Sequence, residues 1–281
     1  MRILSFGVFH LALFMSAFAH DQTRDVYEVY AVEYAVSNNR VPLKTVAVNA
    51  TSTDSTAFSF FVWYLKGNNG RKVLVDTGFL EDSSKSRIPL KQYQRPDRAL
   101  ERIHVEPDDI TDVIITHPHY DHIGGLELFS HATVWMQKND FGYFVGGAWQ
   151  KGANNLGLDK KDVLKAVQAN LDGRLRLVDG DSVEIIPGIR VFIGSRHSYE
   201  SQHVLVSTSG EKVLLASDDV WFYYNIEHML SVPLTFDQDA YVRQLHRMKT
   251  LVSNPNLIIP GHDPGVLSRF EPVAKGVVRI R

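Results

Sequence analysis

The chain has 281 residues, of which 44% are hydrophobic and 22% charged, and its formal net charge is -2. This length and hydrophobic content suffice for one large core. Near-balanced charge, without a cluster of Lys and Arg, argues against a nucleic-acid partner. The absence of cysteine excludes disulfides, thiolate metal ligands and cysteine nucleophiles, so any metal ion must be held by His and carboxylate side chains.

Residues 1–19 have the features of a secretory signal peptide. A charged residue, Arg2, precedes an apolar run, and Ala17-Phe18-Ala19 forms a small-x-small cleavage site. The alternative, an uncleaved membrane anchor, is disfavoured because the run is short for a span and His10 interrupts it. We therefore expect an exported protein, periplasmic or secreted, whose mature chain, residues 20–281, is a single domain without further membrane association.

The first third of the mature chain alternates between apolar and polar residues in the manner of β-strands. We expect strands at 26–32, 45–48 and 58–65, a hairpin turn at 67–70, a strand at 72–75 and a helix at 97–102.

The densest group of polar side chains follows the apolar run Val113-Ile114-Ile115. Its core, His117-Pro118-His119-Tyr120-Asp121-His122, places three imidazoles and a carboxylate within six positions. In extended chain, residues two apart face the same side, so His117 and His119 can converge on one ion while Asp121 and His122 face another. Such ligands suit zinc, iron, cobalt or manganese. A loop of solvated histidines is the disfavoured alternative.

The middle of the chain alternates between predicted helices and strands. Residues 138–160, rich in Gly, Asn and aromatic side chains, lack a clear period and form either a binding loop over the site, which we favour, or packed cover. The other elements that we expect are helices at 123–129 and 162–170, strands at 132–136 and 174–178, and a hairpin at 183–193.

Three later segments again place metal-ligand side chains after apolar runs. They contain His197 within 195–202, Asp218-Asp219 after the run 213–217, and His262 after the strand 257–259. Between the last two, residues 237–251 have helical spacing.

These motifs together resemble the metallo-β-lactamase superfamily. The segment His117-x-His119-x-Asp121-His122 is similar to the signature loop of that family, and the resemblance covers most of the chain after about residue 25. It implies a four-layer αββα sandwich with two metal ions at one edge of its two sheets. The stretch Trp221 to Glu227 and the C-terminal tail are most similar to the N-acyl homoserine lactone lactonase-like members.

The resemblance also implies roles for individual residues. The segment around His197 departs from the family pattern, since Arg196 replaces a Gly and Tyr199-Glu200 replace Pro-Gly, and His203 is expected to be structural. Asp76 either accepts a hydrogen bond from a ligand histidine or only ends a strand. The implied ligands are His117, His119 and His197 for the first ion, Asp121, His122 and His262 for the second, and a bridging Asp218, with Asp219 as the less favoured register.

The activity that the resemblance implies is hydrolysis of a lactone, with N-acyl homoserine lactones as candidate substrates. A hydroxide shared by two divalent ions, Zn2+ in first place and Fe, Co or Mn as alternatives, would attack the carbonyl. Asp121 would hand a proton to the leaving alkoxide. Tyr223, or Tyr224 after one residue of slippage, would polarise the carbonyl, with aromatic core packing as the alternative reading.

Three rival functions remain open at this point. The same site suits other hydrolases acting on thioesters, phosphodiesters, sulfate esters or β-lactams, iron-dependent redox members share the fold, and a non-catalytic binding protein is the least favoured. The expected partner is a small-molecule ester, and the oligomeric state is left open, a homodimer included.

Overall fold

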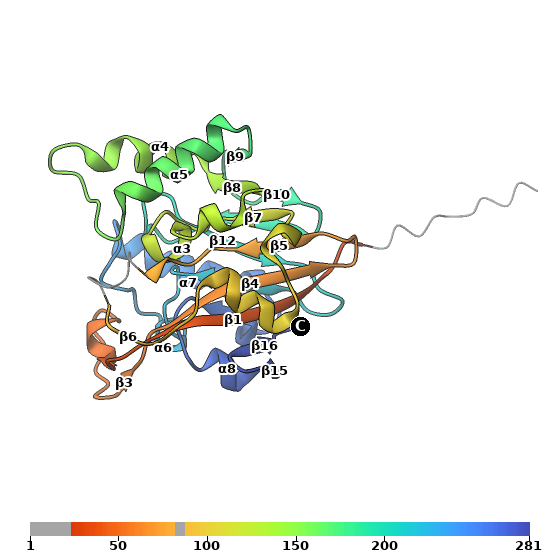
Figure 1. Ribbon diagram of the computed structural model, residues 1–281. Helices are drawn as coiled ribbons and strands as arrows, with labels where there is room; N and C mark the ends of the chain where they lie inside the picture. The colour runs from red at the N-terminus through yellow and green to blue at the C-terminus, as the bar shows by residue number, and fades with distance from the viewer. Residues whose placement is uncertain (1–23, 82–87) are drawn as a thin grey trace, which may run out of the picture.

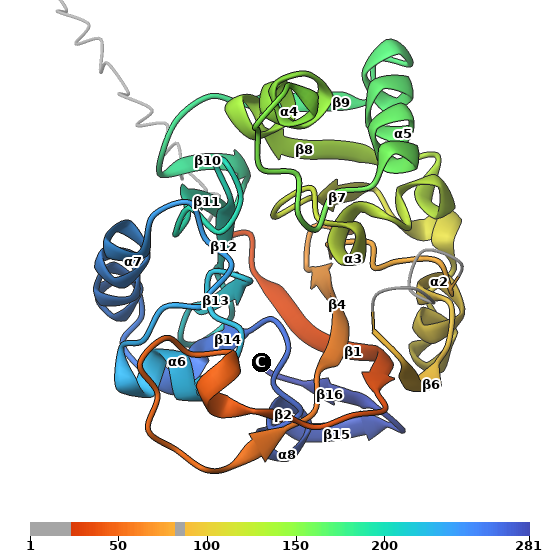
Figure 2. The same ribbon diagram turned by 90° about the vertical axis from the view of Figure 1, so that its left-hand side faces the viewer.

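The predicted αββα sandwich is the architecture that the structure shows. A computed structural model describes residues 24–81 and 88–281, so the predicted signal peptide lies outside the described residues. Two sheets pack face to face, and helices cover both outer surfaces (Figure 1). In the rotated view α7, Gln238–Leu251, lies outside the smaller sheet, while α2, Pro96–Leu100, and α5, Lys160–Leu171, lie outside the larger one (Figure 2).

The larger sheet mixes antiparallel strands with a parallel set, β5-β7-β8-β9. Its strand order is β15 (Glu271–Ala274), β16 (Val277–Arg279), β1 (Tyr27–Ser37), β4 (Ser59–Gly67), β5 (Lys72–Val75), β7 (Asp112–Ile114), β8 (Thr133–Gln137) and β9 (Leu175–Val178), with β6 (Leu90–Tyr93) paired to β1.

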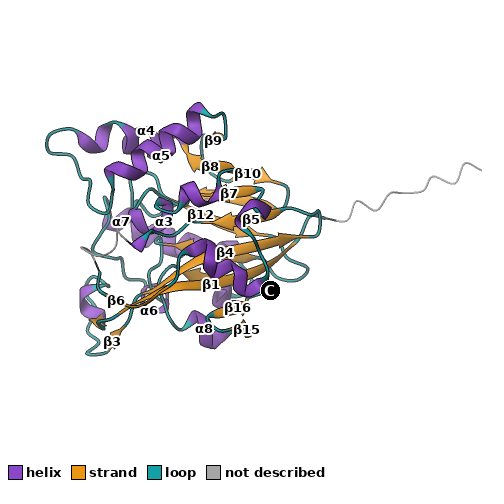
Figure 3. Cartoon of the chain, viewed as in Figure 1, coloured by secondary structure: helices purple, strands orange, loops and turns teal. Residues whose placement is uncertain are grey.

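The smaller sheet has the order β10 (Val183–Ile186), β11 (Ile189–Ile193), β12 (Gln202–Val206), β13 (Val213–Ser217) and β14 (Ile258–Pro260). The β13–β14 pair is parallel, whereas the β10–β11, β11–β12 and β12–β13 pairs are antiparallel. The remaining short elements are β2 (Val41–Pro42), β3 (Ser55–Thr56), α3 (Tyr120–Ile123), α4 (Lys138–Val145), α6 (Tyr223–His228) and α8 (Val266–Arg269) (Figure 3).

The apolar periodicity of the sequence accounts for this layering. On β4, Phe60 and Val62 join the core beneath the helices of the larger sheet, whereas Phe61 and Trp63 join the core between the two sheets. Because successive strand residues face opposite sides, one strand supplies both cores. On α7, Tyr241, Leu245 and Met248 form one buried stripe against the smaller sheet, as their spacing predicted.

Two secondary-structure predictions were wrong. Residues 45–48 do not form a strand: the Leu43 carbonyl accepts hydrogen bonds from the amides of Val46 and Ala47, which curls the chain into a 3-10 turn. The helix expected at 123–129 is split, because α3 ends at Ile123 and a 3-10 turn covers Leu126–Phe129. A Cβ on Gly125 would lie 2.2 Å from the Thr77 carbonyl oxygen, so this close approach requires glycine.

Within the described residues, no helix is both long and apolar enough to pass through a bilayer.

Candidate metal centre

The seven predicted ligands meet where strand ends of both sheets lie side by side. Four of them follow β7 of the larger sheet. Three come from the smaller sheet, where His197 lies between β11 and β12, Asp218 follows β13 and His262 follows β14. Parallel strands deliver the residues after them to the same sheet edge, so residues about 140 positions apart converge.

A first group contains three imidazoles and one carboxylate. His119 Nδ1 lies 3.0 Å from His117 Nε2 and 3.0 Å from His197 Nε2. Asp218 Oδ2 lies 3.1 Å from His197 Nε2. The ligand atoms of all four residues are within 4.8 Å of one another.

A second group contains Asp121, His122 and His262. Asp121 Oδ2 lies 3.6 Å from His122 Nε2 and 3.7 Å from His262 Nε2. The other oxygen of Asp218, Oδ1, lies 3.2 Å from His122 Nε2 and 2.9 Å from His262 Nε2. Asp218 therefore stands between the groups with one oxygen toward each, which is the arrangement that a bridging ligand needs.

The residues present fit two divalent ions. Six of the seven side chains are buried, and a buried polar atom without a partner is costly. His122 Nε2 and Asp218 Oδ1 nevertheless form no hydrogen bond among the described residues, although they lie only 3.2 Å apart. A cation between these atoms would satisfy both, and the set of nitrogen and carboxylate donors suits zinc and its neighbours.

The electrostatics of the cluster favour bound cations. Burial lowers the pKa of His117 well below its ordinary value, and the imidazoles of His122 and His119 add to this, so His117 is neutral as a ligand must be. Burial would also lower the pKa of His122, but Asp218 and Asp121 raise it well above its ordinary value. This negative potential attracts a proton, and equally a metal ion.

Several ligand imidazoles are oriented by a polar contact at the ring nitrogen that faces away from the centre. Asp76 Oδ2 lies 2.8 Å from His122 Nδ1, which favours the first of its two proposed roles. His197 Nδ1 lies 2.7 Å from the Leu234 carbonyl oxygen, and His262 Nδ1 lies 3.1 Å from that of Ser59. Such outer partners fix the tautomer and direct the free nitrogen into the centre.

The structure favours the alternative reading of Tyr223, aromatic core packing. Its ring lies in the core between the sheets, with the Arg269 guanidinium 3.6 Å from the ring centroid, and its buried hydroxyl has no hydrogen-bond partner among the described residues. The Tyr224 ring instead packs in a tilted arrangement against His228, with ring centroids 4.2 Å apart. Both rings belong to α6, which begins only after the chain has turned away from the ligands.

Trp221, and not Tyr223 or Tyr224, lies beside the ligands. Its ring packs near His197 and His262, with centroids 5.8 and 6.4 Å away, and it is partly exposed. A tight turn, in which the Ser217 carbonyl accepts the Val220 amide, folds the chain back after Asp218. In the sequence, the sign of this contact is that Trp221 lies three residues after Asp218, a spacing that one tight turn can bring together.

Residues 138–160 are partly helical, since α4 and a 3-10 turn at Gly147–Trp149 fill their first half. Their second half does lie over the first ligand group. Gly157 has φ +85, and a Cβ on it would lie 2.6 Å from His119 Cδ2. Its carbonyl accepts the Tyr120 amide at 2.9 Å, which ties this loop to the segment that carries the ligands.

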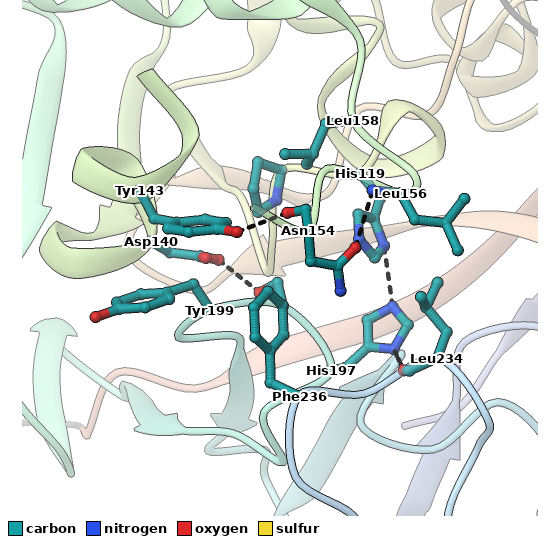
Figure 4. A pocket seen from close by; sticks show the side chains of 12 residues that line it. His119, Asp140, Tyr143, Asn154, Leu156, Leu158, His197, Tyr199, Leu234 and Phe236 are labelled. Carbon is teal, nitrogen blue, oxygen red and sulfur yellow. Dashed lines mark hydrogen bonds between the residues drawn. The ribbon is translucent and has the colours of Figure 1, made fainter. Parts of the chain in front are cut away.

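A pocket opens beside His119 and His197, and its walls are aromatic and aliphatic (Figure 4). The rings of Tyr143 and Tyr199 stack with centroids 4.6 Å apart, and Phe236 meets Tyr143 edge-on at 5.7 Å. The side chains that complete the lining include Leu156, Leu158, Leu234, Asn154, Asp140 and Ser198. Arg196 lies over the Tyr199 and Phe236 rings, so the unusual residues around His197 help to build this pocket.

Comparison with known proteins agrees with this architecture. The family model of the metallo-beta-lactamase superfamily matches residues 53–262. The N-acyl homoserine lactonase AiiA of Bacillus thuringiensis subsp. kurstaki is 25% identical over 248 residues, which cover 82% of this chain and 92% of that protein. The N-acyl homoserine lactonase of Bacillus cereus is 26% identical over 249 residues with the same coverage.

Solved structures show the same fold. An AiiA mutant of B. thuringiensis with N-decanoyl-L-homoserine bound at its active site has a TM-score of 0.69 at 22% identity, covering 88% of this chain and 97% of that one. AidC, a dizinc quorum-quenching lactonase, has a TM-score of 0.63 at 14% identity, covering 85% and 91%. With the family model matching most of its length, the chain belongs to the metallo-beta-lactamase superfamily.

Proposed function

We propose that this chain is a dinuclear metallohydrolase that opens lactone rings, with N-acyl homoserine lactones as the candidate natural substrates. The observation that carries the proposal is the position of Asp218, with Oδ2 beside the first group of ligands and Oδ1 beside the second. Relatives that match 82% of the chain at 25 to 26% identity are N-acyl homoserine lactonases, which supports the lactone among the esters.

The ligands proposed for the first ion are His117, His119 and His197, those for the second are Asp121, His122 and His262, and Asp218 is shared. Two divalent ions held there, Zn2+ in the first place, would supply hydroxide at neutral pH and polarise the carbonyl of the ester. The apolar acyl group would lie along the outside of the aromatic wall formed by Tyr143, Tyr199 and Phe236, because the pocket behind it has room for only about one water molecule.

Asp121 is the residue that we propose as the proton donor to the leaving alkoxide. Its side chain is 11% exposed, against 2% for His122 and 4% for His262, so it is the most open member of its group. A carboxylate at the mouth of the site can exchange protons with solvent and carry one to the leaving oxygen.

The proposal extends to the setting of the enzyme. The single-domain mature chain would begin near residue 20, work outside the cytoplasm and act on a diffusible small molecule. Export would place it where such lactones arrive.

The test combines metal analysis with a pH-stat assay of the mature protein on lactones. We expect two zinc ions per chain and acid release from lactones. Asp218→Ala should lower metal content and cut the rate more than about 100-fold, since ligands matter at least as much as their outer partners. Asp179→Ala, at an exposed ion pair with Lys138, is the control and should change neither.

Other outcomes would identify a rival. Lactone hydrolysis by Asp218→Ala at the wild-type rate would exclude the two-metal scheme. If the protein hydrolysed thioesters, phosphodiesters, sulfate esters or β-lactams faster than lactones, that class of compound would be its substrate instead. Iron with oxygen consumption after aerobic purification would indicate the redox class.

A further inference from the structure

The turn that carries His197 is held from two sides by carboxylates outside the ligand set. We propose that Asp219, at the base of this turn, and Asp140, at its tip, are positioning residues that aim His197 at the first ligand group. The inference rests on the proposed function only in taking His197 as a metal ligand.

The turn, residues 195–201, needs support because its sequence provides little stiffness. Residues 195–201 contain no proline. Proline fixes one backbone torsion, and without it the loop has more conformations to lose on ordering. Arg196 moreover adopts φ +66, a left-handed conformation that is unfavourable for a side chain of this kind. Contacts from outside must therefore fix the shape of the turn.

Asp219 gathers both ends of the turn on one oxygen atom. Its Oδ1 accepts hydrogen bonds from the Ser195 amide at 2.8 Å, the Ser195 hydroxyl at 2.6 Å and the Ser201 hydroxyl at 2.7 Å. The Gly194 amide and the Ser201 carbonyl close the base with a backbone hydrogen bond of 2.6 Å. Residues six apart in the chain are thereby held together by one fully buried carboxylate.

The second oxygen of Asp219 is fixed as well. His203 Nδ1 lies 3.1 Å from Oδ2, and the His203 ring stacks on Phe192 with centroids 5.5 Å apart. A Cβ on Gly194 would lie 2.0 Å from Oδ2, so the backbone leaves room for this carboxylate that only glycine allows. Two adjacent aspartates at the end of β13 thus do different work, Asp218 in the ligand cluster and Asp219 beneath the turn.

Asp140 holds the tip of the turn from the other half of the sandwich. It lies on α4, which follows β8 of the larger sheet, and it is buried. Its Oδ2 accepts the Ser198 hydroxyl at 2.7 Å and its Oδ1 the Glu200 amide at 3.1 Å. Figure 4 shows this side chain reaching toward the turn from the side of Tyr143. The residue directly after His197 is therefore anchored.

The consequence concerns the first ion in particular. With its base and tip fixed, the turn leaves His197 one orientation, in which Nδ1 meets the Leu234 carbonyl and Nε2 faces His119 and Asp218. Among the described residues, Asp219 and Asp140 form no hydrogen bond or ion pair with Asp121, His122 or His262. Loss of either side chain should lower the affinity for the first ion and leave the affinity for the second ion unchanged.

Asp219→Asn and Asp140→Asn test this, because asparagine keeps the size of the side chain and replaces one accepting oxygen with an amide group that donates. The probe is Co2+ added to the metal-free protein, followed by its visible absorption and by equilibrium dialysis. We expect one of the two binding steps to weaken by about 10- to 100-fold, the usual effect of losing an outer partner, and the other to be unchanged. Asp181→Asn is the matched control: Asp181 accepts the Ile193 amide on the same strand but does not touch the turn.

A second background separates positioning from general stability. In His197→Ala, which removes the side chain being aimed, Asp219→Asn should cause no further loss of Co2+ affinity. An equal loss in both backgrounds, or equal weakening of both steps, would overturn the inference. Should Asp219→Asn fail to fold, Ser201→Ala removes one of its donors and should weaken the same step. Wild-type protein that binds two Co2+ but opens no lactone would refute the proposed function and leave this inference standing.

Discussion

Trp221 donates its indole N–H to Asp218 Oδ2 at 2.7 Å, at the oxygen that faces the first ligand group. A hydrogen bond to a charged, buried carboxylate is stronger than one between neutral groups. Trp221→Phe keeps an aromatic side chain, though a smaller one, and removes this donor, so we expect about a 10-fold loss of metal affinity or rate, which metal titration and lactone kinetics would measure. Trp149→Phe, whose indole bonds the Phe144 carbonyl, is the control. Equal behaviour of the two variants would contradict the role of Trp221.

Tyr223→Phe distinguishes the structure from the sequence-based assignment. Because the Tyr223 hydroxyl is buried without a partner among the described residues, its removal should leave the rate unchanged and raise the free energy of unfolding by about 1 kcal/mol. Urea denaturation and kinetics on the same preparation test both halves. A large loss of rate with unchanged stability would restore Tyr223 to the active site.

Gly157→Ala should damage the first ligand group through the His119 ring. The added methyl group meets His119 Cδ2 at 2.6 Å and the backbone has φ +85, whereas Gly152 has φ +80 and open space. Both alanine variants carry the left-handed penalty of about 1–2 kcal/mol. Only Gly157→Ala should also lower metal affinity, as dialysis against Co2+ would show. Equal metal affinity in the two variants would mean that the loop does not press on His119.

Glu33 gives a prediction for the dependence of stability on pH. Burial raises the pKa of Glu33, against the opposing effects of the Ser59 hydroxyl and Arg102. A carboxyl group whose pKa is higher in the folded state binds its proton more tightly there, so the protein loses stability as pH rises above the ordinary value of 4.5 until the folded-state pKa is passed.

In Glu33→Gln this loss is absent. Thermal unfolding from pH 4.5 upward should therefore show the wild type falling relative to Glu33→Gln, whereas Glu127→Gln, at an exposed position, should follow the wild type. Parallel curves for wild type and Glu33→Gln would contradict the prediction.

The sequence predicted the parts of this molecule that depend on local pattern. Alternation on β4 and the helical stripe of α7 each report burial directly, and the ligands follow apolar runs because strands end at the edge of the sheet. The sequence could not place side chains that depend on how the chain turns. Trp221 and Tyr223 are two residues apart, yet one lies beside the ligands and the other in the core, and a single tight turn decides this.

The support of the His197 turn was hidden for a related reason. Asp140 and Ser198 are 58 residues apart and belong to opposite halves of the sandwich, so no local pattern connects them. Gly157 likewise gave no local sign of its contact with His119, since only the fold brings a glycine 38 positions downstream against that ring.

Because the ligands are divided between the two sheets, the stability of the folded chain depends on its metal supply. A cation bound by His117 and His197 together, or by His122 and His262, would cross-link the larger sheet to the smaller one. When the free metal concentration is 100 times the dissociation constant, each bound ion would add about 2.7 kcal/mol to the free energy of unfolding. A chelator would then lower the free energy of unfolding. In metal-poor surroundings the supply of the ion, rather than the packing of the apolar core, would set the lifetime of the folded protein.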